Sequence, residues 1–174
     1  MALTIVGAQC GMTLSNVNTV VDTLKWQMNW GEDAPFYETI LQSMTNLGVA
    51  IGSLCGGAIV GKGRRRTILW SSTLNFFILI PTLFQVYPLM VTCKFIWGIS
   101  NGVTGIAVAR LIEEVLPPKL MSKYGALYNL SLAFGAMLSI LLGLILPKSS
   151  DIEGLKKTEL WRVVFGFPII LSFI

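Results

Sequence analysis

The sequence predicts an all-α membrane protein, a bundle of about six transmembrane helices. Hydrophobic residues make up 53% of the 174 residues and charged residues only 13%, about half the share in a typical soluble domain. The charges are also clustered, so that stretches such as 67–93 contain no Asp, Glu, Lys or Arg. Uncharged apolar runs of 18 or more residues are typical of membrane spans. We therefore expect an integral, multi-pass membrane protein in contact with the lipid bilayer.

Turn residues or charges bound each of the first three expected spans. The first covers about 2–24 and ends at a polar loop, 25–38, which contains two Trp, a Gly and a Pro. The second covers about 39–60 and ends in the basic turn 61–66, which reads Gly-Lys-Gly-Arg-Arg-Arg. The third covers about 67–86 and ends before a Tyr-Pro pair. Gly and Pro at such boundaries are typical of breaks between helices.

The last three spans follow the same rule. The fourth covers about 89–109 and leads into a connector, 110–123, which contains a Pro-Pro pair and most of the local charge. The fifth covers about 124–146. The sixth apolar run, 161–174, would reach only about 21 Å of the ~30 Å hydrocarbon core. We therefore expect the chain to stop inside a helix, as a fragment of a longer protein.

The placement of Lys and Arg predicts the orientation of the spans. Four basic residues lie in the short turn 61–66, and short cytoplasmic loops are enriched in Lys and Arg. This turn and the connector 110–123 are therefore expected in the cytoplasm together with the N-terminus. Because the basic residues lie between apolar spans, a nucleic-acid partner is not expected. Whether the membrane is the plasma membrane or that of an organelle stays open.

Enzymatic chemistry is not expected from the residues available. The chain has no His, which removes the commonest general base and metal ligand. The three cysteines, Cys10, Cys55 and Cys93, lie in apolar runs without a C-x-x-C pair, so we interpret them as small packing residues. The sequence predicts no enzyme activity, no metal site and no cofactor.

Small residues recur at every fourth position on three of the expected helices. This G-x-x-x-G spacing lets helices approach closely in lipid. It indicates either static packing of the bundle or close contacts that slide during a conformational change. The glycines concerned are Gly7, Gly11, Gly48, Gly52, Gly56, Gly98 and Gly102.

The first span carries two polar rows. Gln9, Thr13 and Asn16 have the spacing i, i+4 and i+7, which places them on one helix face. A second row comprises Ser15, Asn18 and Asp22. This helix is too polar to face lipid. Either it lines a wet cavity, where the first row would contact a solute, or its polar groups form hydrogen bonds between helices in a dry bundle.

Five segments, in the right order and spacing, resemble motifs of sugar porters in the major facilitator superfamily. They are 50–67 (G-x-x-x-D-R-x-G-R-R), 93–102 (G-R-F-I-x-G), 114–117 (E-[IV]-[AS]-P), 125–135 (G-S-L-N-Q-L and a following Gly) and 161–166 (W-R-x-x-x-G). The resemblance implies that residues 1–174 are the N-terminal six-helix half of a transporter. It also implies alternating-access transport of a hexose or related sugar, and a missing C-terminal half or partner subunit.

The same resemblance implies a substrate contact. Asn129 stands where the family has a Gln that contacts sugar, and a primary amide suits a pair of sugar hydroxyls. A hydrogen bond between helices is the alternative for Asn129. Facilitated diffusion is favoured over proton symport, because no paired acid stands out in the middle of the membrane.

A gating network of charges is implied as well. Arg64 and Arg65 of the basic turn would help to close an inner gate, or would anchor the turn at the cytoplasmic surface. Glu114 would belong to the same network, whereas the spacing of Arg110 from the two following acids also fits a local ion pair. Lys94 replaces an Arg of the fourth-span motif, and its alternative is to snorkel outward.

Cys10 replaces an aromatic residue that the family has next to Gly11. Two other departures from the family pattern support a second hypothesis. Gly61 stands at the Asp or Asn of the loop motif, and Met121 replaces an Arg after the connector. If gating has been lost, the chain is a degenerate, transporter-like structural subunit of a larger membrane complex.

Overall fold

The structure, a computed structural model, describes residues 2–28, 30–61, 63–84 and 86–144, together with residues 162, 164, 166 and 167. In this part of the chain every regular element is helical and there is no strand, which confirms the predicted all-α class. The elements are α1 (Ala2–Gln27), η1 (Gly31–Asp33), α2 (Ala34–Val60), α3 (Arg64–Leu79), η2 (Pro81–Leu83), α4 (Tyr87–Val115) and α5 (Pro118–Gly143).

Three of the described helices are long and apolar enough to cross a membrane: α2, α4 and α5. They contain 27, 29 and 26 residues, and at 1.5 Å per residue each exceeds the ~30 Å of a hydrocarbon core. Helix α1 also has 26 residues but carries the two polar rows. Helix α3 has 16 residues, fewer than the ~20 of a typical crossing.

Prolines explain why α2 and α3 differ from the expected spans 39–60 and 67–86. Helix α2 begins at Ala34, because Pro35 occupies its first turn, where the missing N–H of proline costs nothing. Helix α3 begins in the basic turn and stops at Leu79, before Pro81. The turn between the two helices depends on Gly63, whose φ of 134° is rarely adopted by other residues.

The expected connector 110–123 is mostly helical in the structure. Helix α4 continues past residue 109 to Val115, and only Leu116 and Pro117 separate it from α5. Leu116 is extended, with φ −108° and ψ 140°, which is the conformation that a following proline imposes. Pro118 then takes the first position of α5. The charges that suggested a loop therefore lie on exposed helix ends.

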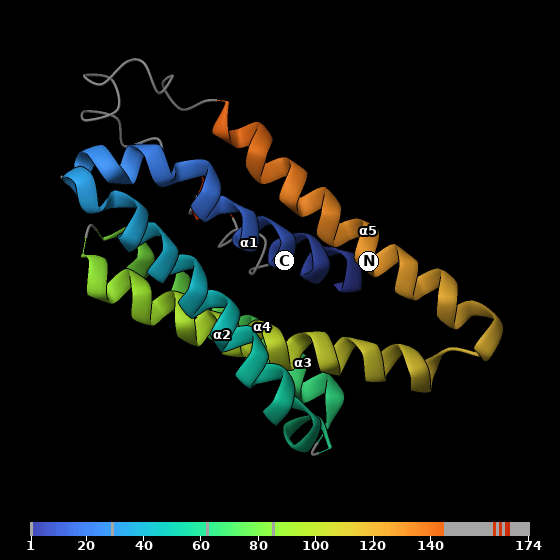
Figure 1. The fold of residues 1–174 in the computed structure, drawn as a ribbon. Helices are drawn as coiled ribbons and strands as arrows, with labels where there is room; N and C mark the ends of the chain where they lie inside the picture. The colour runs from blue at the N-terminus through green and yellow to red at the C-terminus, as the bar shows by residue number, and fades with distance from the viewer. Residues whose placement is uncertain are drawn as a thin grey trace.

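The helices form two groups, as Figure 1 shows. Helix α1 lies along α5, whereas α2 and α3 both pack on α4. Glycines allow the closest approaches. A Cβ on Gly11 would overlap the Leu132 carbonyl group of α5, and a Cβ on Gly52 would overlap the Ile99 carbonyl group of α4. Such backbone-to-backbone contact gives the van der Waals packing that drives helix association in lipid.

An aromatic cluster joins the ends of three helices. The Tyr87 hydroxyl at the start of α4 donates to the Tyr37 carbonyl oxygen of α2 at 3.0 Å. The ring centroids of these two tyrosines lie 5.0 Å apart, and the Trp30 ring lies 5.5 Å from Tyr37 and 5.6 Å from Tyr87. Val20 and Leu24 of α1 belong to the same buried cluster. This end of the bundle is therefore closed by apolar packing.

We predict that Gly52→Ala destabilises the detergent-solubilised protein by about 1–3 kcal/mol relative to Gly57→Ala, because only the first methyl group overpacks a helix contact. A Cβ on Gly57 of the same helix would meet nothing within 4 Å. Both changes gain the same helix propensity, so the difference between the two unfolding free energies measures packing alone. Equal stabilities would show that α2 and α4 do not touch at Gly52.

Candidate functional site

One face of α1 carries a row of polar side chains that the fold buries. Gln9 is 3% exposed, and Thr13 and Asn16 are 0% exposed. The Thr13 hydroxyl donates to the Gln9 carbonyl oxygen one turn earlier at 2.8 Å, so this hydroxyl is satisfied within its own helix. The spacing correctly placed the three side chains on one face, and that face is turned into the bundle.

Lys94 of α4 reaches this row from the other helix group. Its side chain is 0% exposed, and Nζ donates to Asn16 Oδ1 at 2.9 Å and to the Thr13 carbonyl oxygen at 3.4 Å. Nζ also lies 5.7 Å from the centroid of the Trp97 ring. The alternative that Lys94 snorkels outward is wrong, because the amine points to α1. Asn16 therefore takes part in a hydrogen bond between helices.

Two buried donors in this region have no partner. Asn16 Nδ2 and Trp97 Nε1 form no hydrogen bond with the described residues. Buried polar groups in native proteins are nearly always hydrogen-bonded, so both N–H groups favour an acceptor such as a water or a solute hydroxyl. We call Gln9, Thr13, Asn16, Lys94 and Trp97 the midspan polar cluster.

A polar pocket, which we call the amide pocket, lies between α1 and α2. Its volume is about 210 Å³. Gln42 Nε2 donates to Asn18 Oδ1 at 2.5 Å and to Glu38 Oε1 at 3.2 Å. The pocket is lined by Leu14, Val17, Asn18, Gln42, Thr45 and Asn46. Amides offer both donors and acceptors, which suits a ligand with several hydroxyl groups.

Asn18 belongs to the second polar row of α1, whereas its partners on α2 were not predicted from the sequence. Glu38, Gln42 and Asn46 are spaced four residues apart, which places them on one face of α2. This polar row was the available signal for the pocket. No comparable signal existed for Trp97, because an indole in an apolar run is normally a packing residue.

The structure does not bring Asn129 into the midspan polar cluster. Asn129 is exposed on α5. Its neighbours Tyr128 and Ser131 lie close to Gly7 of α1. Within the described residues no hydrogen bond links Asn129 to Lys94. Its amide therefore remains accessible from outside this half of the bundle.

Arg110 and Glu114 of the expected gate lie at the far end of α4 from Lys94. Arg110 forms an ion pair of 3.2 Å with Glu113, and both side chains are exposed. Glu114 and Arg65 are exposed too, whereas the side chain of Arg64 lies outside the described residues. Arg110 is 16 residues beyond Lys94 on α4, roughly 24 Å along the helix. Lys94 therefore cannot form direct contacts with this charged end.

Metal ligands do not gather in the part of the chain that the structure describes. No group of three or more His, Cys, Asp or Glu side chains is placed to hold a metal ion there. Cys10 and Cys93 are buried and Cys55 is exposed. The polar groups of the midspan polar cluster are amides, a hydroxyl, an indole N–H and one amine, which suit hydrogen bonding to a neutral polar molecule.

The known proteins that this chain is similar to are named as transporters. Residues 9–174 match the family model described as "Sugar (and other) transporter". The chain is 26% identical to "Hexose transporter 1" of Plasmodium vivax over 93% of its own length and 35% of that protein. It is 31% identical to a "Facilitated glucose transporter homolog" of Caenorhabditis elegans over 64% of the chain and 22% of that protein. The chain thus spans about a third or less of these relatives.

We predict that Asn16→Ala destabilises the solubilised protein by about 1.5–3 kcal/mol, the usual cost of losing a buried hydrogen bond to a charged group. Asn46→Ala, which removes an exposed amide from α2, is the matched control and should cost less than about 0.5 kcal/mol. Thermal unfolding followed by circular dichroism measures both. Equal effects of the two substitutions would mean that the hydrogen bond between Asn16 and Lys94 does not stabilise the bundle.

Proposed function

The chain belongs to the sugar transporter family, and on this premise we propose that it forms the N-terminal six-helix half of a transporter for a hexose or a related sugar. The proposal covers residues 1–174 as one half, because the family match extends over 9–174. A chain that spans 35% of a relative such as the Plasmodium vivax protein supplies one side of a translocation path. A C-terminal half or a partner subunit supplies the other.

Transport follows an alternating-access mechanism in this proposal. The sugar binds near the midplane of the membrane between two six-helix halves, which rock around it. Helix pairs α1·α5 and α2·α4 move as units, because their glycine contacts are tight. Hydrogen bonds to the sugar are exchanged without any covalent step, so no catalytic residue, metal or cofactor is needed.

The observation that carries the proposal is the buried polar chemistry of α1 and α4. Asn16 Nδ2 and Trp97 Nε1 are buried donors close to Lys94 that have no hydrogen-bond partner among the described residues. Unsatisfied donors in a membrane interior cost several kcal/mol each. A solute hydroxyl that accepts from them when the halves separate would recover that energy. Gln9 and Thr13 belong to the same surface.

Facilitated diffusion is favoured over proton symport. Among the described residues, the buried polar side chains are amides, hydroxyls and Lys94, with no carboxylate. A proton relay in a membrane is usually built from Asp, Glu or His. The gradient of the sugar itself would then drive its movement.

The orientation in the membrane and the inner gate are also part of the proposal. The N-terminus and the basic turn are placed in the cytoplasm, because short basic loops stay there. Arg64, Arg65, Arg110 and Glu114 would meet the second half at an inner gate. The alternative, a structural subunit without transport, is less favoured because the relatives are named as transporters.

We predict that Asn129→Ala lowers hexose uptake about tenfold in proteoliposomes that contain the full-length protein, the effect of losing about one sugar hydrogen bond. Asn129→Gln, which restores the amide, should retain uptake. Leu130→Ala is the neighbouring control, because Leu130 lines an apolar groove of α5 instead. Normal uptake by the alanine variant would remove Asn129 from the site, and absence of hexose uptake by the unmodified protein would overturn the proposed function.

A further inference from the structure

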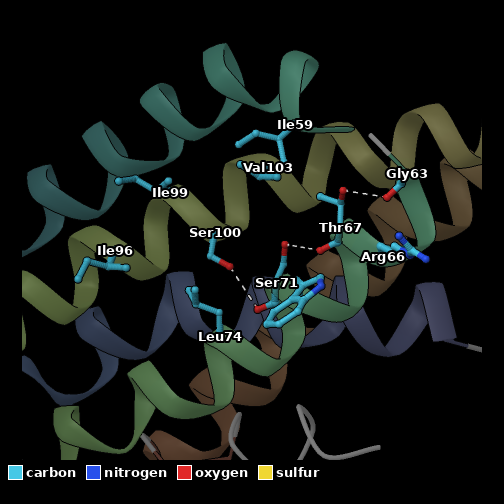
Figure 2. A pocket seen from close by; sticks show the side chains of 11 residues that line it. Ile59, Gly63, Arg66, Thr67, Ser71, Leu74, Ile96, Ile99, Ser100 and Val103 are labelled. Carbon is cyan, nitrogen blue, oxygen red and sulfur yellow. Dashed lines mark hydrogen bonds between the residues drawn. The ribbon is translucent and has the colours of Figure 1, made fainter. Parts of the chain in front are cut away.

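A groove of about 500 Å³ opens between α2, α3 and α4. Ile59 of α2, Leu74 of α3 and Ile99 and Val103 of α4 line it, and Figure 2 shows these apolar side chains around its length. It lies apart from the midspan polar cluster and from the amide pocket, with which it shares no residue. We call it the α3 groove.

The hydroxyl groups in the α3 groove are already used. Thr67 donates to the Gly63 carbonyl oxygen at 3.0 Å and Ser71 to the Thr67 carbonyl oxygen at 2.8 Å. Ser100 of α4 donates to the Ser71 carbonyl oxygen at 3.3 Å, as the dashed lines in Figure 2 show. Because these donors are satisfied within the protein, the groove offers a sugar little to bind. An apolar occupant meets no unsatisfied hydroxyl among Thr67, Ser71 and Ser100.

One end of the α3 groove carries a positively charged side chain. Arg66 lines that end, is exposed, and forms no ion pair with the described residues. Trp70, one turn further along α3, is 74% exposed, and Leu74 follows after another turn. The three side chains have the spacing i, i+4 and i+8, so a guanidinium, an indole and an aliphatic chain follow one another over roughly 12 Å of one helix face.

We propose that the α3 groove binds an anionic phospholipid. The guanidinium of Arg66 pairs with the headgroup phosphate, for which its planar fork of donors is suited. The Trp70 indole lies at the level between headgroup and hydrocarbon, where amphipathic rings are most stable in bilayers. An acyl chain lies over Leu74, Ile99 and Val103. This order of charge, indole and aliphatic side chain matches the order of chemical groups along a lipid.

Charge distinguishes an anionic phospholipid from other ligands with apolar chains. Arg66 is the basic residue of the turn 61–66 that lines the groove among the described residues, and a Lys or Arg near an anionic lipid surface strengthens the attraction. A zwitterionic lipid has an equal tail but no net charge to meet Arg66. The lipid site is independent of sugar transport, since it uses none of the residues assigned to the sugar.

The test uses the full-length protein in nanodiscs of neutral phosphatidylcholine doped with phosphatidylserine that carries a photoreactive diazirine in its acyl chain. Crosslinks should map to peptides of α3 and α4 that line the groove. Arg66→Gln should reduce them about fivefold, the effect of one basic residue at a lipid surface. Arg65→Gln is the matched control, because Arg65 is exposed but does not line the groove, and it should reduce the yield less than twofold.

Three outcomes would overturn the lipid site. Photoreactive phosphatidylcholine that crosslinks as well as phosphatidylserine would show that charge does not select the lipid. Equal losses in the two arginine variants would indicate diffuse attraction to the basic turn. Absence of crosslinks in α3 and α4 would mean that another part of the full-length protein covers the groove. Equal thermal stability of the two variants verifies that a loss of crosslinks is not caused by misfolding.

Discussion

The hydrogen bond from Lys94 to Asn16 fixes how the two helix groups of this bundle lie together. Helices α1 and α4 make few close backbone contacts in the described part of the chain, so a long side chain spans the distance between them. An amine buried at 0% exposure is costly without an acceptor. Asn16 Oδ1 at 2.9 Å supplies it. A shift of one helical turn, about 5.4 Å, would separate the two groups, so the bond sets the register of α1 against α4.

Within each group, close packing replaces polar contacts. Gly11 lets the backbone of α1 touch α5 at Leu132, and Gly52 lets α2 touch α4 at Ile99. In lipid no hydrophobic force drives helices together, so shape complementarity of this kind carries the association. The result is two well-packed units, which are joined by the apolar cluster that contains Val20 and Leu24 and by the polar contacts of Lys94 and Gln42.

The sequence was sufficient for the helical class and the glycine spacing, but not for helix ends or polar partners. Charges and a Pro-Pro pair suggested a connector over 110–123, whereas α4 continues to Val115 and ends only before Pro117. The polar face of α1 was evident from Gln9, Thr13 and Asn16. Its partner was not, because periodicity within one helix says nothing about which residue of another helix lies opposite. Gln42 lies in a polar row that the sequence of α2 contains, but its contact with Asn18 appears only when α2 is placed beside α1.

The most direct test of this account is a double-mutant cycle between Asn16→Ala and Lys94→Met, measured as unfolding free energies of the solubilised protein. Partners in a buried hydrogen bond should show a coupling energy of about 1–3 kcal/mol, with the double variant more stable than the sum of single losses implies. Lys94→Met combined with Asn46→Ala should instead be additive within about 0.5 kcal/mol. Additivity of the Asn16 and Lys94 substitutions would contradict the claim that their hydrogen bond holds the helix groups in place.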